Sequence, residues 1–121
     1  MADELTQVSG WSYSKNGRTR QLTSTSTAHD VSGNGVVEHV QSIGFAAHEA
    51  LDVAEVPTFG FAYFRNADAT NFVQIGIDDG GTFHPFLKLL AGQEAQVWLS
   101  EAPYAQADTG AVLLDYVIVA R

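Results

Sequence analysis

The chain has 121 residues, with 14 acidic and six basic side chains and no cysteine. This length fits one domain with its own core, and the composition excludes disulfides, cysteine nucleophiles and thiolate metal sites. The formal net charge of −8 argues against nucleic acid and anionic membranes as partners, because both require clustered Lys and Arg. The sequence shows neither a secretory signal nor an apolar run long enough to span a membrane, so we expect synthesis in a cytoplasm.

The N-terminal region predicts two extended strands that bury little apolar surface. Leu5 to Tyr13 alternates in polarity, and residues 15–17 (Lys-Asn-Gly) supply a turn because Asn-Gly readily adopts positive φ. Gln21 to Ala28 alternates Ser and Thr, which suits an exposed or edge strand. We expect residues 1–28 to form edge strands of the domain or an extended N-terminal arm. The only local basic group is interpreted as a solvated hairpin end and comprises Lys15, Arg18 and Arg20.

Six further segments alternate in polarity and are bounded by Gly, Asn, Asp or Pro clusters. They are Val36–Phe45, Thr58–Arg65, Asn71–Ile77, Phe83–Leu89, Glu94–Ser100 and Val112–Ala120. Residues 78–81 (Asp-Asp-Gly-Gly) are the clearest hairpin turn, and Ala91-Gly92 predicts another. Both faces of Thr58–Arg65 and Val112–Ala120 are apolar, so we expect these strands to be covered on both sides. Only Phe45–Val53 has a composition suited to a short helical turn.

About eight or nine strands, at spacings of roughly ten residues, predict an all-β fold rather than βαβ units. We expect an antiparallel β-sandwich formed by a single domain over residues 1–121. A jelly roll is the favoured topology. An immunoglobulin-like sandwich is the alternative, although the Cys pair and Trp of true immunoglobulin domains are missing.

No local signature of catalysis is present, so we predict no enzymatic activity, no cofactor and no metal. The four histidines lack the short spacings of metal ligands and are interpreted as surface or interface residues; they are His29, His39, His48 and His84. A Gly-x-Ser-x-Gly motif is also absent, although a triad whose members meet only in space leaves no sequence trace. Asp78 and Asp79, with Asp68 or Asn71, offer oxygen ligands for calcium, but paired Asp before Gly-Gly is typical of a tight turn.

Exposed aromatic side chains are the remaining candidates for function. Alternation places Trp98 on the same face of its strand as the polar Glu94 and Gln96. Trp11 and Tyr104 are further candidates. An aromatic residue on a wet face can bind glycans or anchor a protein interface, and we favour the interface. The interface candidates are Leu5, Trp11, Tyr13, Leu22, Trp98 and Tyr104.

Residues 58–120 follow a recognisable scheme of segments. An aromatic strand at residues 61–64 precedes an Asn-containing loop, a Val-Gln-Ile-Gly strand at 73–76, a hairpin, and Lys88-Leu89 followed by Gly92-Gln93-Glu94. This scheme resembles small β-sandwich structural proteins associated with the virions of tailed bacteriophages. We expect the Asn side chains to bind their own loop, Gly76 to permit a bulge or close approach, and Gly92 to supply a turn. The resemblance transfers no catalytic residues.

The resemblance implies a virion setting for a protein made in a host cytoplasm. We expect a head decoration protein on the outer capsid surface, because an acidic protein is unsuited to the DNA-facing interior. Its partner would be the major capsid protein or another virion protein, contacted through Ala2 to Ala28, and a homo-oligomer is expected with a trimer favoured. The alternatives are a neck, tail or fibre protein, and a carbohydrate-binding module that uses Trp98 or Trp11.

Overall fold

The computed structural model describes residues 4–54 and 56–121. The chain divides into two compact units between Ser32 and Gly33, where the sequence predicted one domain with residues 1–28 as an arm or edge strands. The described residues form ten strands and no helix, and every strand pair is antiparallel. The prediction of an all-β antiparallel fold is confirmed, and the expected strand count was too low.

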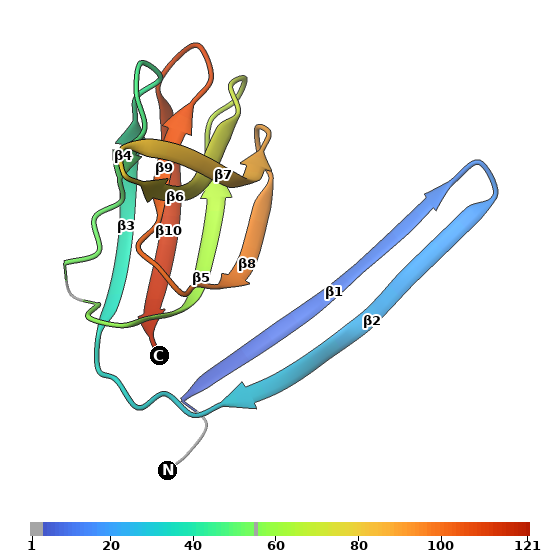
Figure 1. Cartoon of the computed structure of the whole chain (residues 1–121). Coiled ribbons are helices and arrows are strands. Elements are labelled where there is room, and N and C mark those ends of the chain that lie inside the picture. The colour runs from blue at the N-terminus through green and yellow to red at the C-terminus, as the bar shows by residue number, and fades with distance from the viewer. Residues whose placement is uncertain (1–3, 55) are drawn as a thin grey trace. The chain divides into compact units, whose positions relative to one another are not determined.

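The first unit is a long two-stranded hairpin, shown in blue in Figure 1. Strand β1 (Leu5–Lys15) pairs with β2 (Arg18–His29), and Asn16 and Gly17 between them have φ of 51° and 78°. These left-handed conformations define the predicted two-residue turn, which is therefore confirmed. The register shifts between Ser9 and Trp11, where β2 contributes one residue more than β1.

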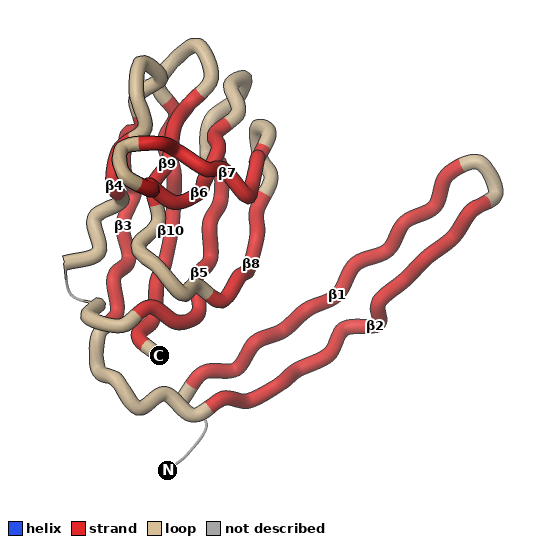
Figure 2. The backbone as a smooth tube through the Cα atoms, viewed as in Figure 1, coloured by secondary structure: helices blue, strands red, loops and turns tan. Residues whose placement is uncertain are grey.

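The second unit contains two four-stranded sheets, whose strands are coloured in Figure 2. One sheet has the order β3-β10-β5-β8, and the other has the order β4-β9-β6-β7. The strands are β3 (Val36–Ile43), β4 (Glu49–Ala50), β5 (Phe59–Asn66), β6 (Val73–Asp79), β7 (Thr82–Leu89), β8 (Glu94–Trp98), β9 (Tyr104–Ala107) and β10 (Val112–Ala120). The sequence did not predict β4 or β9, and the segment with helix-favouring composition instead forms bends and β4.

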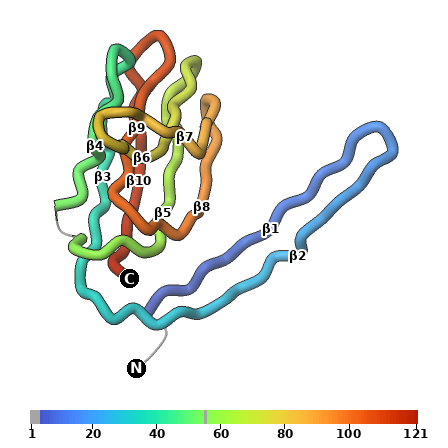
Figure 3. The backbone as a smooth tube through the Cα atoms, viewed as in Figure 1, coloured from blue at the N-terminus to red at the C-terminus, as the bar shows by residue number. Residues whose placement is uncertain are grey.

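Side chains from both sheets meet in a single core. Tyr116, Phe64 and Ile118 come from one sheet and Val73 and Ile75 from the other, and all are fully buried. The unit is therefore a two-layer, sandwich-like arrangement. Figure 3 colours the backbone by residue number, so the order in which the chain visits the two sheets can be followed.

The outer face of β10 contradicts the expectation that this strand is covered on both sides. Leu113 is 51% exposed, and Val117 and Val119 are only half-buried. In a two-layer unit each sheet has one outer face, so these side chains are shielded only by neighbours within their own sheet. In β5 the outward Phe61 is nevertheless buried, because Trp98 packs edge-on against it with ring centroids 5.5 Å apart.

The loop after β5 is held by asparagine side chains, as the sequence predicted. The buried Asn66 amide donates to the carbonyls of Asn71 and Leu89, each at 2.9 Å, and its oxygen accepts from the Asp68 amide at 2.8 Å. Asp68 in turn accepts from the amides of Asn71 and Thr70, which lower the pKa of its carboxyl group. The loop therefore satisfies its backbone internally.

Two glycines of the same region also behave as predicted. The ladder between β6 and β7 shifts register at Ile75–Gly76, and a Cβ at Gly76 would collide with the backbone of His84 and Pro85. Gly92 has a φ of 80° and forms the turn before β8. Gly76 is thus required for close approach, and Gly92 for its conformation.

Tyr116 connects the core to the segment after β4. Its hydroxyl lies 2.9 Å from the Asp52 carbonyl and 3.0 Å from the Gln41 side-chain oxygen. Burial raises the pKa of Tyr116 to about 12, because an apolar environment disfavours the phenolate. The folded state thus binds a proton that the unfolded state releases near pH 10.

We predict that stability falls as the pH rises from about 10 to about 12, since the Tyr116 contribution is fully present below pH 10 and is lost through that interval. Tyrosinate absorbance, followed during alkaline titration alongside circular dichroism, checks this. Tyr116 should ionise late and together with unfolding, and a Tyr116→Phe variant should lack that step. Ionisation of all four tyrosines near pH 10 in a chain that stays folded would contradict it.

Candidate functional site

The hairpin presents two chemically different faces. Strand alternation places Trp11, Tyr13 and Lys15 of β1 on one face of the ribbon. Their cross-strand partners on β2 point to the same face and are Leu22, Arg20 and Arg18, respectively. These six residues define the Trp11 face. The other face carries small polar side chains such as Ser12 and Ser14, opposite Gln21 and Thr19. Apolar and basic side chains are therefore concentrated on the same face of the ribbon.

The aromatic residues of the Trp11 face project into solvent. Trp11 is 57% exposed and Tyr13 is 50% exposed, whereas Leu5, nearer the start of β1, is half-buried. Within the part of the chain described, β1 and β2 pair only with each other, so each strand has an open edge. Two strands that pair only with each other are at best marginally stable in water.

Charge is distributed unevenly between the two units. Residues 1–32 contain three acidic and three basic side chains, and all three basic ones lie near the hairpin turn. Residues 33–121 contain 11 acidic and three basic side chains, which gives this unit the whole net charge of −8. The hairpin turn is thus a local cationic site in an acidic protein.

The other two interface candidates lie on different sheets of the second unit. Trp98 ends β8, is 41% exposed and has the Arg121 guanidinium 5.8 Å above its ring. It also lines a shallow hollow of about 230 Å³ with Phe86 and Ile77. Tyr104 begins β9 and is half-buried, 5.7 Å from the His48 ring. Trp98 and Tyr104 therefore lie on different sheets, and the role of the six candidates at an interface stays a prediction.

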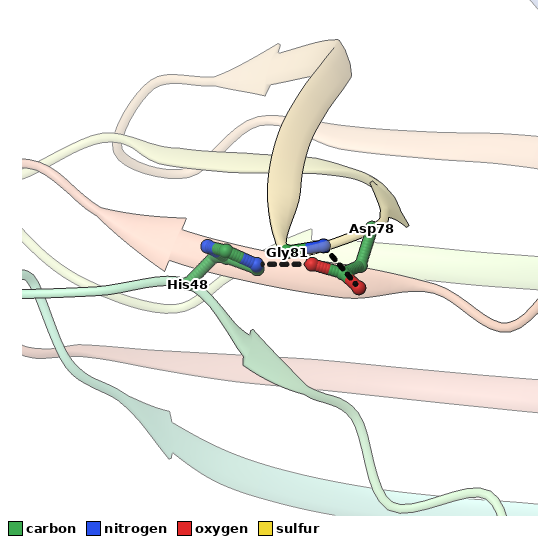
Figure 4. A network of polar contacts seen from close by, with 3 residues as sticks. All are labelled: His48, Asp78 and Gly81. Atoms are coloured by element: carbon green, nitrogen blue, oxygen red, sulfur yellow. Dashed lines mark hydrogen bonds and ion pairs between the residues drawn. The ribbon is translucent and has the colours of Figure 1, made fainter.

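A histidine–aspartate pair is a polar contact that sequence reasoning missed. His48 Nε2 lies 2.6 Å from Asp78 Oδ1, while Asp78 Oδ2 accepts from the Gly81 amide at 3.4 Å (Figure 4). The His48 ring stacks on Phe83 with centroids 5.2 Å apart. The partners are 30 residues apart in the chain and meet only in space, so no motif marks them.

The pair ties the segment before β4 to the β6–β7 hairpin. Gly80 and Gly81 have φ of 61° and 93°, so the predicted turn at residues 78–81 is confirmed. A histidine oriented by a carboxylate supplies two of the three members of a catalytic triad, and no serine or threonine hydroxyl is hydrogen-bonded to His48 among the described residues. The Asp78 carboxylate bridges His48 and the Gly81 amide of the turn.

Neither a metal site nor a membrane-spanning helix is found in the described part of the chain. Residues 4–54 and 56–121 contain no group of three or more His, Asp or Glu side chains placed to hold a metal ion. No helix among them is long and apolar enough to cross a membrane. No family model, curated protein or solved structure matches this chain.

We predict that Asp78→Ala lowers the free energy of unfolding by about 1 kcal/mol, because a partly exposed pair with good geometry contributes roughly that much. Urea denaturation checks this. Asp79→Ala is the matched control, since Asp79 is exposed at the same turn and its removal should cost less than about 0.5 kcal/mol. Equal effects of the two substitutions would show that the His48 contact contributes nothing.

Proposed function

We propose that this chain is a non-enzymatic structural protein of a phage virion, most concretely a head decoration protein that binds the outer capsid surface. The observation that carries the proposal is the hairpin, which exposes Trp11 and Tyr13 and leaves both strand edges open. Such a ribbon gains stability when a partner covers its apolar face or adds a strand. The resemblance of residues 58–120 to virion-associated proteins of tailed phages supplies the setting.

We further propose that residues 33–121 form a jelly roll. The division into four and four strands supports this topology over an immunoglobulin-like sandwich of the constant type, which has four and three. The chain also changes sheet at every step from β3 to β10 except between β6 and β7, and its first and last strands, β3 and β10, are neighbours. Jelly rolls consist of eight strands and recur in viral capsid proteins.

The dimensions and charges fit a clamp between capsid subunits. Strands of 11 and 12 residues extend for roughly 36 to 40 Å at about 3.3 Å per residue, long enough to cross a subunit boundary. The open edges can add to a sheet of the major capsid protein, and apolar side chains bury on contact. The acidic second unit suits an outward-facing position away from packaged DNA. A homo-oligomer, with a trimer favoured, would present several hairpins at once.

Two other functions are each supported by a specific observation. The same hairpin would serve a neck, tail or fibre protein, and the location of the chain in intact particles distinguishes these positions. A carbohydrate-binding role is favoured by Trp98 and the hollow beside it, since exposed aromatic rings can stack on sugars. A glycan array tests that role, and an array without binding would remove it.

The proposal predicts that the purified chain cosediments with undecorated capsids of the source phage and raises their disruption temperature. The double variant Trp11→Ser/Tyr13→Ser should bind at least about tenfold more weakly, because buried aromatic anchors dominate interfaces. Phe45→Ser is the matched control, since Phe45 is also about half exposed but lies between β3 and β4. Capsids that neither bind the chain nor gain heat resistance would overturn the decoration role.

A further inference from the structure

One outer face of the second unit combines apolar and acidic side chains. In the sheet β3-β10-β5-β8, alternation directs Val36, Glu38 and Val40 of β3 outward, next to Leu113 and Asp115 of β10. The three apolar residues are each more than half exposed. These five residues define the acidic sheet face.

The register interleaves the two kinds of side chain. Asp115 lies opposite Val40, and Glu38 lies opposite Val117, so each carboxylate has an apolar neighbour across the strand pair. Arg65 lies opposite Asp115 on the other side and opposite Glu94 on β8. With three carboxylates and one guanidinium, the region keeps an excess of negative charge.

The other sheet lacks this combination. Its outward side chains include Gln74, with Gln106 and Lys88 as cross-strand neighbours. The Lys88 ammonium lies 4.2 Å from the centre of the Phe72 ring, so this face carries amides and a cation. Among the described residues, the sheet that contains β10 therefore combines three exposed aliphatic side chains with carboxylates, whereas β7 of the other sheet exposes Phe86 near Lys88.

The Trp11 face of the hairpin is complementary to the acidic sheet face. It offers exposed aromatic rings at Trp11 and Tyr13, with Lys15, Arg18 and Arg20 beside them. Two hairpins that met through this face would bring six cations together, which like-charge repulsion disfavours. Contact with the acidic sheet face instead places cations against carboxylates while it covers apolar surface on both sides.

We propose that the Trp11 face of one copy docks on the acidic sheet face of a second copy of this chain. This docking rests on the proposed function in one respect, since both take the hairpin as the binding element. It adds a second copy of the chain as the partner of the Trp11 face. Because the two surfaces differ, the contact is heterologous and closes into a ring when its rotation allows, a trimer being one such ring. The strand edges are then left for the capsid, and loss of Trp11 and Tyr13 weakens capsid binding because the assembly no longer presents several hairpins at once.

A charge-swap experiment on the full chain tests the docking. The hairpin variant Arg18→Glu/Arg20→Glu and the sheet variant Glu38→Lys/Val40→Lys should each weaken self-association at least about tenfold in sedimentation velocity, because each opposes like charges. A variant that combines all four substitutions in one chain should recover the mass of the wild-type assembly, since its reversed hairpin fits the reversed sheet of the next copy whatever the number of copies in the ring. Recovery also shows that the substitutions leave the chain folded.

The matched control is Asp79→Lys/Thr82→Lys, which makes the same charge change as the sheet variant at exposed positions of β6 and β7. It should self-associate like the wild type, and added salt should weaken the wild-type assembly. A wild-type chain that stays monomeric at every concentration, a combined four-substitution variant that is not rescued, or a control that is equally impaired would overturn the docking. If the docking is overturned but the wild-type chain still binds capsids, the decoration role stands without self-association.

Discussion

A two-stranded ribbon cannot bury its own side chains, and the proposed function depends on this constraint. Strands β1 and β2 satisfy each other's backbone groups on one edge only, and they hold Trp11 and Tyr13 in water. Burying an aromatic side chain contributes on the order of 2 kcal/mol, and the isolated hairpin forgoes that contribution. Any surface that covers the ring of Trp11 therefore stabilises the ribbon, so binding and ordering are linked.

The second unit has the opposite character. Its two sheets share a core around Tyr116 and Phe64, and the buried Asn66 fixes a loop through hydrogen bonds to three backbone groups. This unit carries the entire net negative charge. The buried core thus lies in residues 33–121, whereas the hairpin exposes Trp11 and Tyr13 beside three of the six basic side chains.

Much of the fold was predictable because it depends on local patterns. Alternation of polarity located eight of the ten strands. The glycines of the two hairpin turns have the positive φ that was expected, and Gly76 lies at a shift in strand register. The two short strands escaped because β4 has only two residues and β9 is Tyr-Ala-Gln-Ala, whose alanines and glutamine favour strands weakly. Apolar composition overstated the burial of β10, since a sequence does not reveal how many layers cover a sheet. The His48–Asp78 contact and the acidic sheet face depend on register between distant strands, which no local spacing encodes.

The central claim is that the hairpin is a binding element completed by a partner. Hydrogen exchange of the backbone amides of β1 and β2, compared between the dilute free chain and the chain assembled on capsids, tests it most directly. The account predicts weak protection of the hairpin in the free chain, at least about tenfold slower exchange in the assembly, and no change in β6 or β9 of the other sheet. A hairpin already as protected as β10 in the free chain, or one unchanged on assembly, would contradict it.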